Sequence, residues 1–233
     1  MKKLLAAVAV VALVAVGVGV WWFVIRDDSV EKKTSECDPE PCAEATVDSF
    51  DGAWGVVAGE SQGTLVITEQ IGGLVDHQAQ GSTGDLTGTV EVADDAVTAA
   101  SLTIDLAALE FTDDPGGFDV ANRANAMRTQ GLQTDQFPDA TFVLTAPIPL
   151  EGDLAGGDTV TADATGDLTL HGVTRSITFA VDVTADGDRV RVSPTEFVPI
   201  ALADYEMTVN GPPFVADISD EGSFDFLLVL EAA

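Results

Sequence analysis

The chain has few basic residues. It carries 10 Lys and Arg against 39 Asp and Glu, so its 233 residues have a formal net charge of -29. A surface this acidic repels the phosphate backbone of nucleic acids and anionic lipid head groups. We therefore expect no nucleic-acid partner, and the simplest role of the charge is to keep the protein in solution.

Side chains for catalysis and metal binding are also scarce. The sequence has two histidines, His77 and His171, and two cysteines, Cys37 and Cys42, with no histidine near the cysteine pair. A structural zinc site takes four Cys or His ligands, and a catalytic nucleophile needs a neighbouring base. The carboxylates are so numerous that pairs at calcium-site or glycosidase spacing arise by chance. We expect no enzyme activity, no metal and no cofactor.

One uncharged stretch, residues 4–25, follows Met1-Lys2-Lys3. A helix of this length, rising about 1.5 Å per residue, spans the ~30 Å hydrocarbon layer of a membrane. The lysines before it, and Asp27 and Asp28 after it, orient the rest of the chain outside the cytoplasm. A signal-peptide cleavage site needs small residues, and bulky residues stand there instead. We therefore expect residues 1–25 to form an uncleaved, single-pass signal anchor in the cell membrane. The alternative is a cleaved signal peptide and a secreted protein.

Residues 26–49 are charged and short of large apolar side chains, which predicts an extracytoplasmic acidic linker. Outside the cell, Cys37 and Cys42 are expected to form a disulfide that closes a small loop and stiffens this linker. The hydrophobic content of 46% is enough for one sizeable core, which we assign to residues 50–233.

Apolar and polar residues alternate clearly on both sides of Gly172. Leu168 and Leu170 precede it and Ile177 and Phe179 follow it, each separated by polar or small residues. Similar alternation recurs in 86–106 and 223–230, while the Gly-rich segment at 72–84 is a weak strand candidate between breaks. The short spacing of these segments predicts eight to ten strands in an antiparallel barrel or sandwich. In the hairpin around Gly172, His171 is expected to cap the turn or to be exposed.

Residues 113–137 break the strand pattern. Asp114-Pro115-Gly116-Gly117 is a turn signal, and 118–130 has the composition of a short helix that Gly131 is well placed to end. This segment is the one clear helical candidate of the domain, and it is suitably placed to cover a barrel mouth.

Two motifs resemble the signatures of the YceI-like family. They are GDLTLHGVTR at 166–175 and GLQTDQFPDATF at 131–142, in the family's order and spacing. The resemblance covers about residues 54–231. It implies an all-β fold, an antiparallel lipocalin-like β-barrel with a short helical insertion, secreted or attached to a membrane. Members of the family bind long isoprenoid or related amphiphilic chains in an internal tunnel.

A tunnel for an apolar chain needs inward aliphatic and aromatic side chains, because an unpaired buried polar group costs free energy. For each single candidate, ordinary core packing is the alternative. The candidates for an apolar lining are Trp54, Leu65, Ile67, Val90, Leu102, Ile104, Leu106, Phe111, Phe118, Met127, Phe137, Phe142, Leu144, Leu168, Leu170, Ile177, Phe179, Phe224 and Phe226.

The helical segment also offers Arg123, Asn125 and Arg128. Their donors suit a polar head group such as a phosphate or a quinone oxygen. The alternative is a solvated helix face that pairs with the abundant carboxylates.

The sequence thus supports two functional hypotheses. The first is a membrane-anchored, extracytoplasmic protein that binds a long-chain isoprenoid or quinone-like lipid for storage or transport. The second is a surface interaction or stress-response module whose barrel is filled and has no lipid ligand. The partners expected under the first hypothesis are the lipid and the membrane, and a homodimer is left open.

Overall fold

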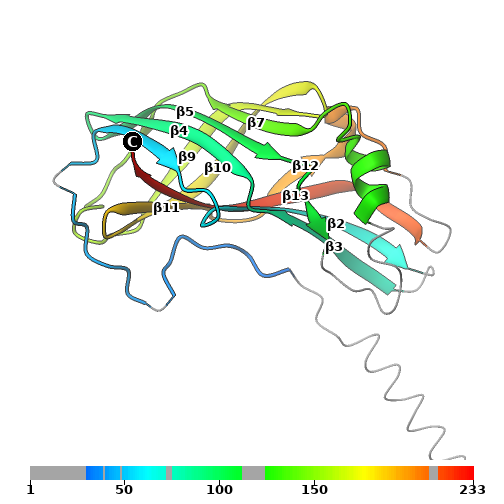
Figure 1. Cartoon of the computed structure of the whole chain (residues 1–233), viewed down its shortest axis with the longest axis horizontal. Helices are drawn as coiled ribbons and strands as arrows, with labels where there is room; N and C mark the ends of the chain where they lie inside the picture. The colour runs from blue at the N-terminus through cyan, green and yellow to red at the C-terminus, as the bar shows by residue number, and fades with distance from the viewer. Residues whose placement is uncertain (1–29, 39, 48, 72–74, 112–123, 210–214) are drawn as a thin grey trace, which may run out of the picture.

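The computed structural model describes residues 30–233 apart from 39, 48, 72–74, 112–123 and 210–214. These residues form thirteen β-strands and two short helices (Figure 1). The elements are β1 (Gly52–Val56), β2 (Gln62–Ile71), β3 (Val75–Thr83), β4 (Leu86–Ala93), β5 (Ala96–Asp105), β6 (Glu110–Phe111), η1 (Met127–Leu132), β7 (Asp139–Leu144), β8 (Ile148–Pro149), β9 (Val160–Leu170), β10 (Val173–Asp186), β11 (Arg189–Pro194), β12 (Val198–Ala201), η2 (Leu202–Tyr205) and β13 (Val215–Ala232).

The strands form one antiparallel sheet in the order β1-β4-β5-β7-β9-β10-β11-β13-β2-β3-β6. The sheet closes because β1 also pairs with β13, from Trp54↔Ala232 to Val56↔Leu230. Strand β13 is 18 residues long, and it pairs with β1 and β11 near its end and with β2 and β12 earlier. Closure leaves β1 and β13 without a free edge there. The predicted antiparallel barrel is therefore confirmed.

Two hairpins have the turns that their sequences favour. The β9–β10 turn is His171-Gly172, with φ of 52° and 74°, and the β4–β5 turn is Asp94-Asp95, with φ of 53° and 58°. A two-residue turn with positive φ at both positions follows the right-handed twist of the flanking strands. Gly172 adopts such a φ at little cost because it lacks a Cβ.

The observed strand number exceeds the eight to ten that we predicted. Three of the strands, β6, β8 and β12, have only two to four residues, which is too short for an alternating pattern to stand out. The Gly-rich segment that we considered weak contains β3, which pairs with β2 from Gly63↔Thr83 to Ile71↔Val75. Pairing with a strong neighbour compensates for the low strand propensity of β3.

The single predicted helix is present over its described part, and residues 118–123 lie outside the described residues. Described helical residues begin at 124, and a π-helical turn runs over Met127–Leu132. The helix ends at Leu132 because Gln133 adopts a left-handed conformation, with φ of 51°. Gly131, which we expected to end the helix, lies inside it and is buried beside Val209.

Inside the barrel the apolar side chains form two clusters. The C-terminal cluster includes Trp54, Val183 and Leu230, and the helix-side cluster includes Leu106, Phe111, Leu170 and Met207. Figure 1 shows the two ends of the barrel, with the C-terminus at one end and the green helix at the other. Ile104 and Phe224 pack against both clusters, so the two halves form one continuous interior.

The described part of residues 30–47, which we call the strap, runs along the outside of the barrel (Figure 1). The Lys33 amide donates to the Asp225 carboxylate, and Arg191 Nε donates to the Ser35 carbonyl at 3.0 Å. Further on, the Thr46 amide donates to the Gly187 carbonyl at 2.8 Å. The strap is thus fixed to β11, to β13 and to the β10–β11 turn.

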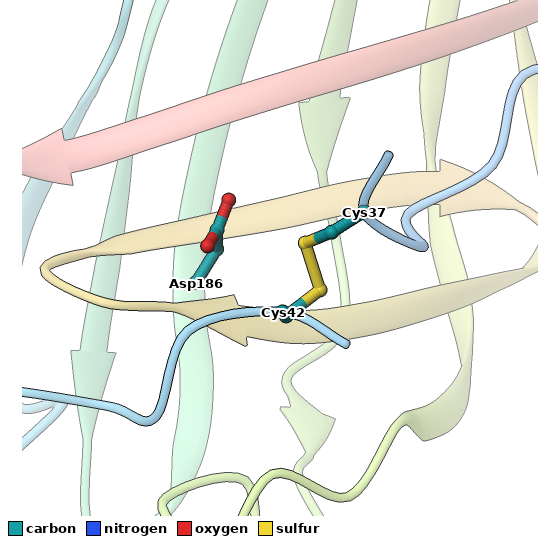
Figure 2. Close-up of side chains that lie close together, drawn as sticks. All are labelled: Cys37, Cys42 and Asp186. Carbon is teal, nitrogen blue, oxygen red and sulfur yellow. A yellow bond between two sulfur atoms is a disulfide. The ribbon is translucent and has the colours of Figure 1, made fainter. Parts of the chain in front are cut away.

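Cys37 and Cys42 form a disulfide within the strap. The side chain of Asp186 lies next to it, at the end of β10 (Figure 2). The same carboxylate accepts a hydrogen bond from the Ala43 amide at 3.2 Å. The disulfide loop is therefore attached to the β10–β11 hairpin.

Among the described residues no helix is both long enough and apolar enough to cross a membrane. The anchor that we expect over residues 1–25 lies outside the described residues.

Candidate functional site

The barrel contains a cavity of about 230 Å³. Its walls come from strands on every side of the barrel and from η1. Most of the side chains that border it are aliphatic or aromatic, and the polar ones are Thr64, Thr87, Thr103, Thr141, Ser223 and Asp225. Gly222 and Leu230 both line it. They are eight residues apart on β13, which corresponds to about 27 Å at ~3.4 Å per residue. The cavity is therefore long, narrow and apolar.

Small inward residues create this space. Gly63, Ala100, Ala140 and Ala164 lie on four different strands and all border the cavity. A barrel of about this size either fills with side chains or holds one slender ligand. Because these four positions carry a methyl group or no side chain, the interior is not filled.

Large inward side chains keep part of their surface accessible. Leu102, Phe142, Leu144 and Phe179 line the cavity and are only half-buried. A core side chain in a filled barrel would be fully packed. The accessible surface of these residues is therefore the surface available to an apolar ligand.

Four phenylalanine rings meet inside the barrel. The ring centroid of Phe179 lies 5.5 Å from that of Phe142, 5.8 Å from that of Phe224 and 6.1 Å from that of Phe226, all in edge-to-face geometry. Phe224 and Phe226 stack at 6.3 Å. These distances are within the range of favourable aromatic pairs.

Most of the predicted apolar residues border this cavity. Those that do are Trp54, Leu65, Ile67, Val90, Leu102, Ile104, Leu106, Phe111, Met127, Phe142, Leu144, Leu168, Leu170, Phe179, Phe224 and Phe226. Phe118 lies outside the described residues. Phe137 and Ile177 do not border the cavity in the described part of the chain.

The position of Phe137 has a clear cause. Its ring packs on that of His171, with centroids 4.4 Å apart, and its Cε1 would be 2.7 Å from a Cβ at Gly172. Phe137 therefore covers the β9–β10 turn. His171 is half-buried there, and its Nδ1 forms a 3.1 Å hydrogen bond with the Tyr205 carbonyl. This histidine is thus a structural residue of the turn, as the sequence suggested.

Further residues line the cavity that the sequence patterns did not indicate. Leu86, Leu109, Ile200, Leu202 and Met207 all border the cavity. Leu86 could have been found, because it shares its side of β4 with Val90 and Val92. The others lie in short strands, loops or η2, where no periodic pattern identifies the inward side.

Of the predicted head-group residues, neither Asn125 nor Arg128 borders the cavity in the described part of the chain. Arg128 Nη1 donates to the Leu109 carbonyl at 2.6 Å, and Asn125 is exposed. Met127, Gly131 and Leu132 line the cavity instead. Arg128 does not border the cavity, and its guanidinium is held at the Leu109 carbonyl. Arg123 lies outside the described residues.

Asp225 is a buried carboxylate on β13 that accepts a hydrogen bond from the strap. It is 1% exposed, and burial raises the pKa of its carboxyl group, while the hydrogen bond from the Lys33 amide opposes this rise. Its Oδ1 has no hydrogen-bond partner among the described residues. The charged form of Asp225 therefore costs folding free energy.

Cys37, Cys42 and Asp186 are close enough to share a metal ion within the described part of the chain (Figure 2). The two sulfur atoms are bonded to each other, however. A zinc site of this kind needs thiolates, so this cluster is a disulfide with a neighbouring carboxylate.

The fold and the cavity define a hollow antiparallel barrel, and the comparisons agree with this class. The YceI-like domain family matches residues 54–230. The chain therefore belongs to the YceI-like family, as its two sequence motifs indicated.

Two solved structures are similar over most of their length. A polyisoprenoid binding domain from Saccharophagus degradans implicated in plant cell wall breakdown has a TM-score of 0.59 and 25% identity, covering 77% of this chain and 98% of that one. BcnA from Burkholderia cenocepacia has a TM-score of 0.54 and 23% identity, covering 75% and 98%. At 23% identity, the similarity to BcnA shows a shared fold alone.

Two curated relatives are UPF0312 proteins from strains of Pseudomonas putida. Each is 43% identical over 56 residues, which is 24% of this chain. The aligned stretch spans 26% of the length of those proteins.

Proposed function

We propose that this protein binds a long-chain isoprenoid or quinone-like amphiphilic lipid inside its barrel and stores or transports it. The observation that carries the proposal is the long apolar cavity lined by aliphatic and aromatic side chains. A slender hydrocarbon chain matches both its shape and its chemistry.

Burial of the chain supplies the affinity. Each methylene group moved from water into an apolar site contributes about 0.8 kcal/mol. An apolar cavity of about 150 Å³ in another protein already binds benzene, and the cavity here is about 230 Å³. Binding therefore needs no charged contact with the chain.

The relationship to the Saccharophagus degradans domain supports the same ligand class. That domain is described as polyisoprenoid binding, and it aligns with 77% of this chain at 25% identity. The inward side chains on the shared strands are where an isoprenoid would lie in this barrel. We assign the protein no bond-making or bond-breaking activity.

We further propose that the barrel works outside the cytoplasm, tethered to the cell membrane by residues 1–25. The uncharged run and its flanking charges support this orientation. The Cys37–Cys42 disulfide supports it independently, because stable disulfides are typical of oxidising compartments.

The test is to purify the full chain from its native host without detergent, extract it with organic solvent and analyse the extract by mass spectrometry. We expect one long-chain isoprenoid or quinone-like lipid per protein. Repeatedly empty extracts would reject the proposal and favour the surface interaction or stress-response module. The apolar cavity disfavours that alternative, which requires a filled barrel.

A further inference from the structure

Four phenylalanine rings line the cavity and contact one another. Phe142 is on β7, Phe179 on β10, and Phe224 and Phe226 are on β13. In the sheet order β9 lies between β7 and β10, and β11 lies between β10 and β13. Phe179 therefore reaches Phe142 over β9, and reaches Phe224 and Phe226 over β11, while Phe224 and Phe226 are neighbours along β13. We call these four residues the phenylalanine constriction.

The constriction lies where the two apolar clusters meet. Phe226 belongs to the C-terminal cluster, Phe142 packs against the helix-side cluster, and Phe224 packs against both. The cavity continues on each side, to Trp54 in one direction and to Met207 in the other. A chain that extends through the whole cavity must pass the four rings.

The neighbouring strand leaves room for the rings. A Cβ at Gly166 would lie 2.4 Å from Cζ of Phe142, so only glycine lets this ring lie against β9. Phe179 is opposite Ala164, which is small and also lines the cavity. The small residues of β9 thus match the large residues of β7 and β10.

On this basis, and resting on the proposed function, we propose that the phenylalanine constriction determines how long a hydrocarbon chain the barrel accepts. A chain that fits on the helix side of the rings binds without rearrangement. A longer chain must move Phe179, which then loses its contacts with three other rings. Phe179 is therefore the main specificity-determining residue.

The test measures dissociation constants of the delipidated full chain for linear prenols of increasing length, from geraniol through farnesol and geranylgeraniol to longer polyprenols. In the native protein, affinity is expected to rise with each isoprene unit and then to level off when the chain reaches the rings. Phe179→Ala is expected to move this plateau to prenols that are longer by at least one isoprene unit. It should also tighten the binding of these longer prenols about tenfold.

Two further variants sharpen the test. Ala164→Val places extra carbon atoms opposite Phe179, so the plateau should move to shorter prenols. Phe137→Ala removes a ring that packs on His171 and not in the cavity, so the plateau should not change. If Phe179→Ala does not fold, Phe179→Leu keeps an apolar side chain while removing the ring.

The outcomes separate this inference from the proposed function. If the native protein binds prenols but the Phe179 variants show the same plateau, the constriction does not set chain length and the inference is wrong. If the native protein binds no prenol and its extracts contain no lipid, the proposed function fails and the inference fails with it.

Discussion

Phe179 on β10 lies directly opposite Ala164 on β9. Both line the cavity, so a ring on one strand lies beside a single methyl group on the next strand. Replacing that methyl group with a larger side chain should fill the interior from within, without any change of the outer surface.

We therefore expect Ala164→Leu to reduce the amount of co-purified lipid at least about tenfold. The added carbon atoms occupy volume that the ligand's methylene groups would occupy, at about 0.8 kcal/mol each. Lipid extracted per protein, measured by mass spectrometry, checks this. The matched control is Thr165→Leu, because Thr165 points outward and its hydroxyl is within hydrogen-bond distance of the Thr178 hydroxyl. Unchanged lipid content in Ala164→Leu would contradict the cavity as the binding site.

Asp225 makes stability depend on pH. Burial raises the pKa of its carboxyl group in the folded protein above the usual value of about 4. The folded protein favours the neutral carboxyl group. The stabilisation of the folded state that this gives is therefore fully present below the pKa of Asp225 in the unfolded chain. It is lost as the pH rises through the folded pKa.

Asp225→Asn should therefore stabilise the protein at neutral pH, by on the order of 1 kcal/mol, and flatten the pH dependence of its stability. An Asn carbonyl can still accept the Lys33 amide hydrogen bond. Urea unfolding at neutral and mildly acidic pH measures both effects. Asp217→Asn, an exposed change on the same strand, is the control. The same pH profile for native protein and Asp225→Asn would rule out this effect.

The disulfide should hold the strap on the barrel. Cys37 and Cys42 close a small loop, and the chain-entropy estimate for such a loop is about 2 kcal/mol. We expect reduction to speed proteolysis of the strap while the barrel remains folded. Limited proteolysis with and without reductant tests this. A double Cys37→Ser, Cys42→Ser variant should be cleaved rapidly with and without reductant. If the strap resists cleavage after reduction, the disulfide does not hold it on the barrel.

Gly172→Ala should destabilise the β9–β10 hairpin. Gly172 has a φ of 74°, and a Cβ there would lie 2.7 Å from the Phe137 ring. Backbone strain and overpacking together predict a loss of about 2 kcal/mol. Thermal unfolding would detect it. Gly55→Ala is the matched control, because a Cβ at Gly55 meets no atom within 4 Å. Equal melting temperatures for the two variants would contradict this account.

Much of the fold could be predicted because alternation and turn chemistry are local properties. The hairpin around His171 and Gly172, and the inward sides of β4, β9, β10 and β13, follow from period two in the sequence. The strand β3 could not be predicted in this way, since its small and polar residues form a strand only when β2 pairs with them.

The candidate site was only partly predictable for the same reason. Phe137 looks like a lining residue because it is aromatic and near the helix, yet its partner is His171, on a distant turn. The Arg128 guanidinium donates to the Leu109 carbonyl, 19 residues away. Such contacts depend on how separate segments meet, which a linear pattern does not encode.

The sequence alone determined that this chain forms antiparallel strands with one apolar side, and its two motifs indicated the YceI-like family. Only the tertiary structure decided that the interior is hollow. Whether apolar side chains fill a barrel depends on the volumes that neighbouring strands bring together on the inner side of the sheet, such as Phe179 beside Ala164 and Phe142 against Gly166. Those pairings are fixed by sheet register and closure, which join residues far apart in the chain.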